Sequence, residues 1–106
     1  MSMTPDEIGD SGSRIVEESF VSDGWKCDRE MQISGSVDLH AHKNGCLRLV
    51  QVKTCVIPKM CSTLSSNELR IIKSRAANLK CEAWLAQVRI DESGQQVGKI
   101  QWSPLR

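Results

Sequence analysis

The segment 36–54, SVDLHAHKNGCLRLVQVKT, constrains the fold of this chain more than any other part of the sequence. Two runs of strand-forming residues flank a Lys-Asn-Gly turn at 43–45, a pattern typical of a tight β-hairpin. Residues 37–42 alternate apolar and polar side chains, as in a strand with one buried face. Residues 47–54 hold apolar side chains on both faces, which is typical of a central strand. The segment therefore predicts a hairpin whose second strand lies inside a sheet.

Two helices are expected around this hairpin, and each begins with a capping-box motif. These motifs, Thr-x-x-Glu at 4–7 and Ser-x-x-Glu at 65–68, each precede an apolar stripe at helical spacing. The first helix extends to about residue 21, and its firm part is expected to begin only near Gly12, because glycines weaken its first half. The second helix extends to about residue 80.

Further strands are expected at residues 25–33, 81–90 and 97–102. The resulting order is α-β-β-β-α-β-β. This order predicts an α/β fold in which helices flank a mixed sheet. At 106 residues, the chain (1–106) is expected to form a single domain.

Composition restricts the location and partners of the protein. Fourteen basic and thirteen acidic residues nearly balance, so a nucleic-acid partner has to be contacted through a local basic patch. No apolar run approaches the roughly 20 residues of a membrane span. Residues 1–12 lack the pattern of a signal peptide, so we expect a cytoplasmic protein that is not secreted. The five cysteines are odd in number and form no CxxC pair, and most are expected to be reduced core residues.

Polar side chains inside the two hairpin strands form the candidate site. Strand alternation places Asp38 with His40 and His42 on one face, and hairpin pairing brings Asp38 toward Gln51 and Lys53. Carboxylate and amide oxygens suit Mg²⁺, which can polarise a phosphate and activate a water. A lysine can offset negative charge in the transition state. The cluster predicts phosphodiester hydrolysis, and the alternative is a strand end that emerges into solvent.

The two histidines allow a second interpretation. Asp38, His40 and His42 place three potential ligands on one strand face, and imidazole favours zinc or another transition metal over magnesium. In the other interpretation the histidines contact substrate or are partly exposed strand residues.

The order and spacing of these motifs resemble the PD-(D/E)XK nuclease superfamily. The resemblance rests on an N-terminal helix with glutamates, then SGSVDLHA, then LVQVKT, and it covers about residues 12–88. The GSR before the glutamates and the SGS-x-D loop are most similar to archaeal-type Holliday-junction resolvases. The Q-x-K in place of acid-x-lysine is similar to Mrr-type restriction enzymes and group I intron homing endonucleases. The resemblance implies a restriction-endonuclease-like core.

The resemblance also assigns roles to residues at the matching positions. It implies that Asp38 binds the metal, that Lys53 is the catalytic lysine, and that Gln51 takes the second ligand position. That ligand is either the Gln51 amide oxygen or the neighbouring Val52 carbonyl. A valine at position 37 stands where the superfamily usually has proline.

A helix glutamate completes the pattern. Glu17 and Glu18 are the candidates, and Glu18 is favoured because it borders the apolar edge of the helix. Both lie closer to Gly24 than resolvases usually place theirs, so Glu7 remains a third candidate.

Several further residues are candidates for contacting DNA. Ser34 and Ser36 resemble the resolvase serines that touch the scissile backbone, although a Gly-Ser loop is also a common flexible joint. Arg70 and Lys73 on the second helix could contact phosphates, and the alternative is a solvated helix face.

The resemblance implies a metal-dependent DNA endonuclease, with Mg²⁺ as cofactor and Mn²⁺ as an alternative. A Holliday-junction resolvase acting on branched or duplex DNA is the leading expectation, because the chain holds only a catalytic core. Since a two-strand cut needs two sites, we expect a homodimer. A homing or restriction-like endonuclease is the second interpretation. The third is a catalytically weakened nucleic-acid-binding module, with Gln51 as the sign of lost activity.

Overall fold

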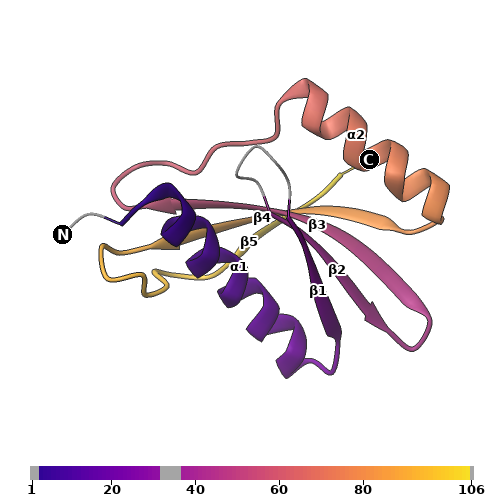
Figure 1. The fold of residues 1–106 in the computed structure, drawn as a ribbon, viewed down its shortest axis with the longest axis horizontal. Coiled ribbons are helices and arrows are strands. Elements are labelled where there is room, and N and C mark those ends of the chain that lie inside the picture. The colour runs from indigo at the N-terminus through magenta and orange to yellow at the C-terminus, as the bar shows by residue number, and fades with distance from the viewer. Residues whose placement is uncertain (1–2, 32–36, 106) are drawn as a thin grey trace.

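The computed structural model describes residues 3–31 and 37–105. Seven elements follow one another in the predicted order (Figure 1). They are α1 Pro5–Ser22, β1 Lys26–Met31, β2 Val37–Lys43, β3 Cys46–Val56, α2 Ser66–Leu79, β4 Glu82–Ile90 and β5 Gln101–Pro104.

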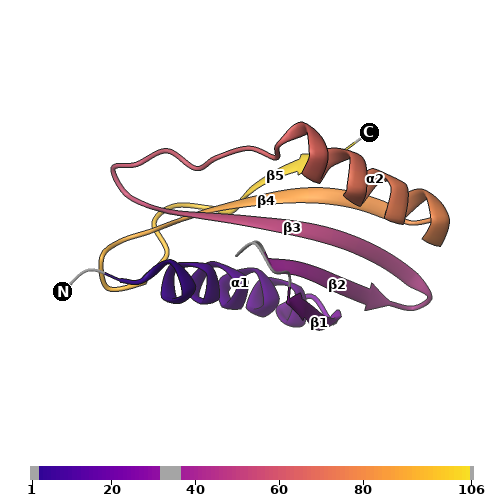
Figure 2. The ribbon, with the colours of Figure 1, turned by 45° about the horizontal axis from the view of Figure 1, so that its top comes forward.

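The five strands form one mixed sheet in the order β1-β2-β3-β4-β5. All neighbours are antiparallel except β3 and β4, which are parallel and joined through α2. Helices α1 and α2 lie on opposite faces of the sheet (Figure 2). The prediction of a mixed sheet flanked by helices is therefore confirmed, with β3 in the centre of the sheet.

Alternation along β3 divides the molecule into two cores. Val50 and Val52 point toward α1 and pack in the larger cluster with Val16 and Phe20 of that helix. Leu49 points the other way and packs against Ile72 of α2 in a smaller cluster. We call the side of the sheet covered by α2 the α2 face. The burial of both faces explains why β3 reads as an apolar run.

Helix α1 is continuous from Pro5, so the expectation that its firm part begins near Gly12 was wrong. Thr4 caps the helix by accepting from the Glu7 N–H, and the Glu7 side chain accepts from the Thr4 N–H at 2.9 Å. Gly12 lies against β3, where an added Cβ would fall 1.7 Å from Thr54 Oγ1. The glycine therefore permits close packing of helix on strand, and this packing offsets its low helix propensity.

The last strand lies further along the chain than the expected range 97–102. Strand β5 occupies Gln101–Pro104, and only an isolated bridge from Gln96 to Ile90 precedes it. The Asp91 carboxylate accepts backbone N–H bonds from Ser93 and Gln95, which stabilises a turn. Gly98 has a φ of +74° and interrupts the extended backbone. These two features delay the return of the chain to the sheet.

The hairpin turn follows the sequence prediction. Asn44 and Gly45 have φ values of 50° and 82°, the left-handed conformation that a two-residue turn of this type requires. The turn sets the β2–β3 register, in which Asp38 pairs with Gln51.

The cysteines depart from expectation. Cys55 and Cys61 form a disulfide, whereas Cys27, Cys46 and Cys81 are free thiols. Most of the cysteines are therefore reduced, as predicted, but none of the three free thiols is buried in the core. The Cys55–Cys61 bond was not predicted, because spacing alone does not reveal which loop folds back on its strand. Within residues 3–31 and 37–105, neither helix combines the length and hydrophobicity of a membrane span.

Candidate active site on the α2 face

Strand β3 presents Gln51 and Lys53 on the α2 face, two residues apart and therefore on the same side of the strand. In the sheet, Gln51 pairs with Asp38 of β2 and Lys53 pairs with Gln87 of β4. The register thus brings the predicted Asp-Gln-Lys set to one region of the sheet. The Asp38 side chain lies outside what the structure describes, so Asp38 is placed by its backbone register alone.

Lys53 is held by a carboxylate from α2. Its Nζ donates to Glu68 Oε2 at 2.7 Å, and the two side chains are 17% and 27% exposed. The other oxygen, Glu68 Oε1, accepts from the Ser65 N–H at 3.0 Å, and Ser65 Oγ accepts from the Glu68 N–H. One carboxylate therefore joins the start of α2 to the middle of β3. A partly buried pair in this geometry is stronger than a surface ion pair.

The pKa of Glu68 reflects this environment. Burial alone raises the pKa of the carboxyl, but the hydrogen bonds from Lys53 and Ser65 and the charge of Lys53 outweigh it. Together they lower the pKa to about 2. Glu68 is therefore an anion at neutral pH, and it offers a fixed negative charge to the site.

Gln51 is almost fully buried, with 3% of its surface exposed. Its Nε2 has no hydrogen-bond partner among the described residues. A buried amide group without a partner costs free energy, and such groups mark sites of strain or of an absent ligand. This amide is the one buried polar side chain on the described part of the α2 face, since the other buried polar residue, Ser13, belongs to α1.

His40 has a cationic neighbour. The Arg75 guanidinium of α2 lies with Nη2 3.1 Å from His40 Nε2, and arginine can only donate, so the imidazole accepts at that atom. His42 Nε2 lies 3.8 Å from Asp28 at a more exposed position. A guanidinium at the ring nitrogen opposes a zinc ion there, so the arrangement favours the substrate-contact interpretation of His40. Within the described ranges, no three His, Cys, Asp or Glu side chains gather to hold a metal ion.

The predicted helix glutamates lie elsewhere. Both are on α1, which covers the face of the sheet opposite to Lys53 (Figure 2). The Glu17 carboxylate accepts from Arg29 Nε of β1, and Asp10 accepts from the same guanidinium at 2.7 Å. Glu18 is solvent-exposed. The structure therefore does not bring Glu17 or Glu18 together with Lys53, and Glu7 is occupied by its capping box.

The predicted DNA contacts differ in what the structure says of them. Ser34 and Ser36 lie outside the described residues. Arg70 is exposed on α2 and donates to Asn67 of the same helix. Lys73 lines a hollow of about 300 Å³ with Trp84 and Leu105, on the side of α2 toward β5. Arg75 of α2 differs from Arg70, because its guanidinium contacts His40 of β2, the strand that carries Asp38.

The donor set fits a hard divalent cation. Carboxylate and amide oxygens are the ligands that Mg²⁺ prefers, and Glu68 and Gln51 supply both types on one face. The amide without a partner agrees with that fit, because exchange of its oxygen and nitrogen positions would leave an acceptor free to bind a cation. The Val52 side chain packs in the core on the α1 side, which leaves only its backbone carbonyl as a ligand.

Sequence reasoning missed Glu68 as a site residue. Its motif was interpreted only as a helix start, which is also correct. One signal was present: the parallel β3-α2-β4 connection returns the chain along the sheet. Such a connection places the start of α2 near the residues that end β3. Only the tertiary structure shows that the capping glutamate also reaches Lys53.

Comparisons with known proteins show a likeness in structure and none in sequence. No known protein family matches the sequence, and no curated protein matches it. Among solved structures, the chain is similar to Hjc, a Holliday junction resolvase from the archaeal hyperthermophile Archaeoglobus fulgidus. The TM-score is 0.72 at 16% identity, over 92% of this chain and 72% of that one. The fold is therefore that of the Hjc resolvase, and the predicted nuclease-like α/β core is confirmed.

Proposed function

We propose that this protein is a metal-dependent endonuclease that hydrolyses phosphodiester bonds in DNA. Its expected substrate is a four-way junction, and its expected cofactor is Mg²⁺, with Mn²⁺ as an alternative. The observation that carries the proposal is the contact between Lys53 and the Glu68 carboxylate. Gln51 lies on the same face of the sheet, and it pairs with Asp38 in the β2–β3 ladder. These residues lie in a fold similar to that of a solved Holliday junction resolvase.

The proposed metal ligands are Asp38, Glu68 and Gln51. Glu68 supplies the negative charge that Gln51 lacks, because its lowered pKa keeps it ionised at neutral pH. Magnesium bound there would polarise the phosphate and lower the pKa of a bound water.

Lys53 takes the role of stabilising the substrate's charge. Its side chain lies on the same face as Gln51 and is only 17% exposed, so the ammonium group acts in a partly dehydrated environment. There it would donate to a phosphate oxygen as negative charge develops in the transition state. Arg75, held beside His40, is placed to bind a neighbouring phosphate and orient the DNA.

A second function is supported by one specific feature. Gln51 stands where acid-x-lysine nucleases carry a carboxylate, and its buried Nε2 lacks a partner among the described residues. If Glu68 does not serve as the missing acid, the chain would be a DNA-binding module without cutting activity.

The deciding experiment is a cleavage assay with four-way-junction and linear duplex DNA, with Mg²⁺, Mn²⁺ and Zn²⁺ each titrated. Asp38→Ala and Lys53→Ala are expected to reduce Mg²⁺-dependent cutting by at least about 100-fold while DNA binding persists. Arg14→Ala is a matched control, because this exposed residue lies on α1 and pairs with Asp10. Faster cutting of junctions than of duplex supports a resolvase. If wild-type protein binds DNA but never cuts it with any of the three metals, the binding-module interpretation holds instead.

A further inference from the structure

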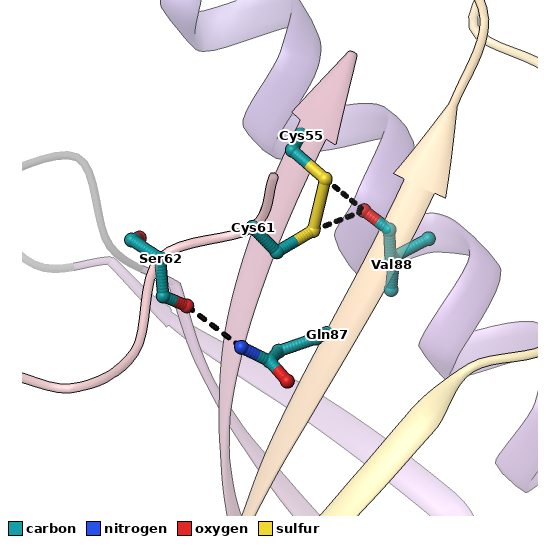
Figure 3. Close-up of a disulfide and its surroundings, with 5 residues drawn as sticks. All are labelled: Cys55, Cys61, Ser62, Gln87 and Val88. Atoms are coloured by element: carbon teal, nitrogen blue, oxygen red, sulfur yellow. Dashed lines mark hydrogen bonds between the residues drawn. A yellow bond between two sulfur atoms is a disulfide. The ribbon is translucent and has the colours of Figure 1, made fainter. Parts of the chain in front are cut away.

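A disulfide joins β3, the strand that carries Lys53, to the segment that follows it. Cys55 lies two residues after Lys53 on β3, and therefore on the same α2 face. It is bonded to Cys61, with the two Cα atoms 4.9 Å apart, so the segment at Cys61 lies beside the strand (Figure 3). Cys61 is four residues before Ser65, the N-cap of α2.

A second contact fixes the same segment. Gln87 Nε2 of β4 donates to the Ser62 carbonyl oxygen at 3.0 Å (Figure 3). Gln87 is the residue that pairs with Lys53 in the parallel β3–β4 ladder. Cys61 is therefore bonded to β3, and Ser62 is hydrogen-bonded to β4. Both contacts lie close to the Lys53–Gln87 pair. From Ser62 only a short segment leads to Glu68, whose carboxylate contacts Lys53.

The surroundings accommodate both oxidation states of the pair. The sulfur atoms of Cys55 and Cys61 lie 3.8 and 3.3 Å from the Val88 carbonyl oxygen (Figure 3). A disulfide sulfur carries no hydrogen, whereas a thiol can donate to such an oxygen. Reduction therefore supplies donors for a carbonyl that is already in place. Opening the bond changes the tether of the loop without leaving a buried thiol unsatisfied.

We propose that the Cys55–Cys61 disulfide is a redox-sensitive latch that positions Glu68 against Lys53. The inference rests on the proposed nuclease function, whose site it would regulate. With the bond closed, the first turn of α2 is tethered to β3 and the carboxylate is in place. With the bond open, the segment is held by the Gln87 contact and by the weaker hydrogen bond of the Cys61 thiol to the Val88 carbonyl, so Glu68 is less often beside Lys53. The oxidised protein is then the more active nuclease.

The reductant is a small-molecule thiol or dithiol. Its thiolate attacks the Cys61 sulfur, because Cys55 is only 7% exposed whereas Cys61 is partly exposed. This step forms a mixed disulfide and breaks the Cys55–Cys61 bond, and the departing Cys55 thiolate takes up a proton. A second thiolate from the reductant attacks the reductant's sulfur in the mixed disulfide and releases Cys61, which is also protonated. The protein gains two electrons and two protons, and the reductant is oxidised to its own disulfide.

The partly buried free thiols compete poorly in this exchange. Burial, together with the nearby Glu17 and Asp28 carboxylates, raises the pKa of Cys27 to about 11. Burial and the charge of Glu82 also raise the pKa of Cys81. Since the thiolate is the attacking species, both remain largely unreactive near neutral pH. Cys46 is exposed but lies at the opposite end of β3 from Cys55.

The test compares air-oxidised and dithiothreitol-treated protein, with the bond verified by mass. Mg²⁺-dependent junction cutting and Mg²⁺ affinity are expected to fall about tenfold or more on reduction and to recover on reoxidation. Cys61→Ser is expected to match the reduced protein and to ignore the reductant. Cys46→Ser is the matched control, and it should respond to the reductant as the wild type does.

Hydrogen exchange of the Glu68 and Leu69 amides gives a readout that does not depend on activity. These amides bond to Ser65 in the first turn of α2, and their protection is expected to fall when the disulfide opens. Loss of protection in a protein that never cuts DNA would leave the latch in place and overturn only the proposed function. Unchanged protection after verified reduction, or failure of the oxidised protein to form the bond, overturns the latch.

Discussion

At the scale of single residues, the proposed function divides one role, that of the second metal ligand, between two side chains. Gln51 occupies the position where related motifs carry an acid, and Glu68 brings a carboxylate from α2 to the same lysine. The division is physically reasonable because Gln51 is buried and neutral, whereas Glu68 is partly exposed and ionised.

This division predicts a compensating pair of substitutions. Glu68→Gln is expected to reduce Mg²⁺-dependent cutting by roughly 10–100-fold, because it removes a charged ligand. Adding Gln51→Glu to that variant is expected to recover part of the rate by returning a carboxylate to the same face. Glu7→Gln is the matched control, because it alters the equivalent capping position of α1 away from the site. Cutting kinetics measure all three. Equal rates for Glu68→Gln and wild type would remove Glu68 from the site.

The pKa of Glu68 also predicts how stability depends on pH. The carboxyl titrates near 4.3 in an unfolded chain and at about 2 in the folded protein, so the folded state favours the ionised form. Its contribution is therefore complete above the unfolded pKa and is lost as the pH falls toward about 2. Urea unfolding of wild type and Glu68→Gln should show a stability difference at pH 7 that shrinks below about pH 4.3. A difference that grows on acidification would contradict this sign.

At the scale of elements, the packing of α1 on β3 depends on Gly12. The sequence suggested that this glycine weakens the helix, but the structure shows a close approach to Thr54. The two interpretations predict opposite effects of adding a methyl group.

Gly12→Ala is therefore expected to destabilise the protein. The new Cβ would fall 1.7 Å from Thr54 Oγ1, and forced overpacking of this kind typically costs about 1–3 kcal/mol. In an open helix the same substitution would stabilise by about 1 kcal/mol. The sign of the change in unfolding free energy, measured in urea, decides between them.

At the scale of the whole molecule, the expected assembly follows from the proposed reaction. One chain contributes one Lys53–Glu68 site, and resolving a junction requires a cut in each of two strands. We therefore expect the protein bound to a junction to be a homodimer. Light scattering after size exclusion of the complex should give twice the 11.8 kDa of the chain plus the mass of one junction. A monomer at concentrations that saturate junction cutting would contradict this expectation.

Local signals in the sequence determined much of the architecture. Both capping boxes, the Asn44-Gly45 turn and the two apolar faces of β3 have direct physical causes within a few residues. The hairpin register also follows from its turn, and it was sufficient to pair Asp38 with Gln51. These features were predictable because they depend on contacts between neighbours in the chain or across one tight turn.

Contacts between distant segments were decided only by the tertiary structure. The Lys53–Glu68 pair and the Cys55–Cys61 bond depend on how the loop before α2 folds back across β3. Glu17 and Glu18 lie on α1, which covers the face of the sheet opposite to Lys53. Periodicity places a side chain on one face of its own element, but the packing of elements determines what that face meets. For this reason the sequence could offer Asp38, Gln51 and Lys53 as candidate site residues, and only the fold added Glu68 to the candidates.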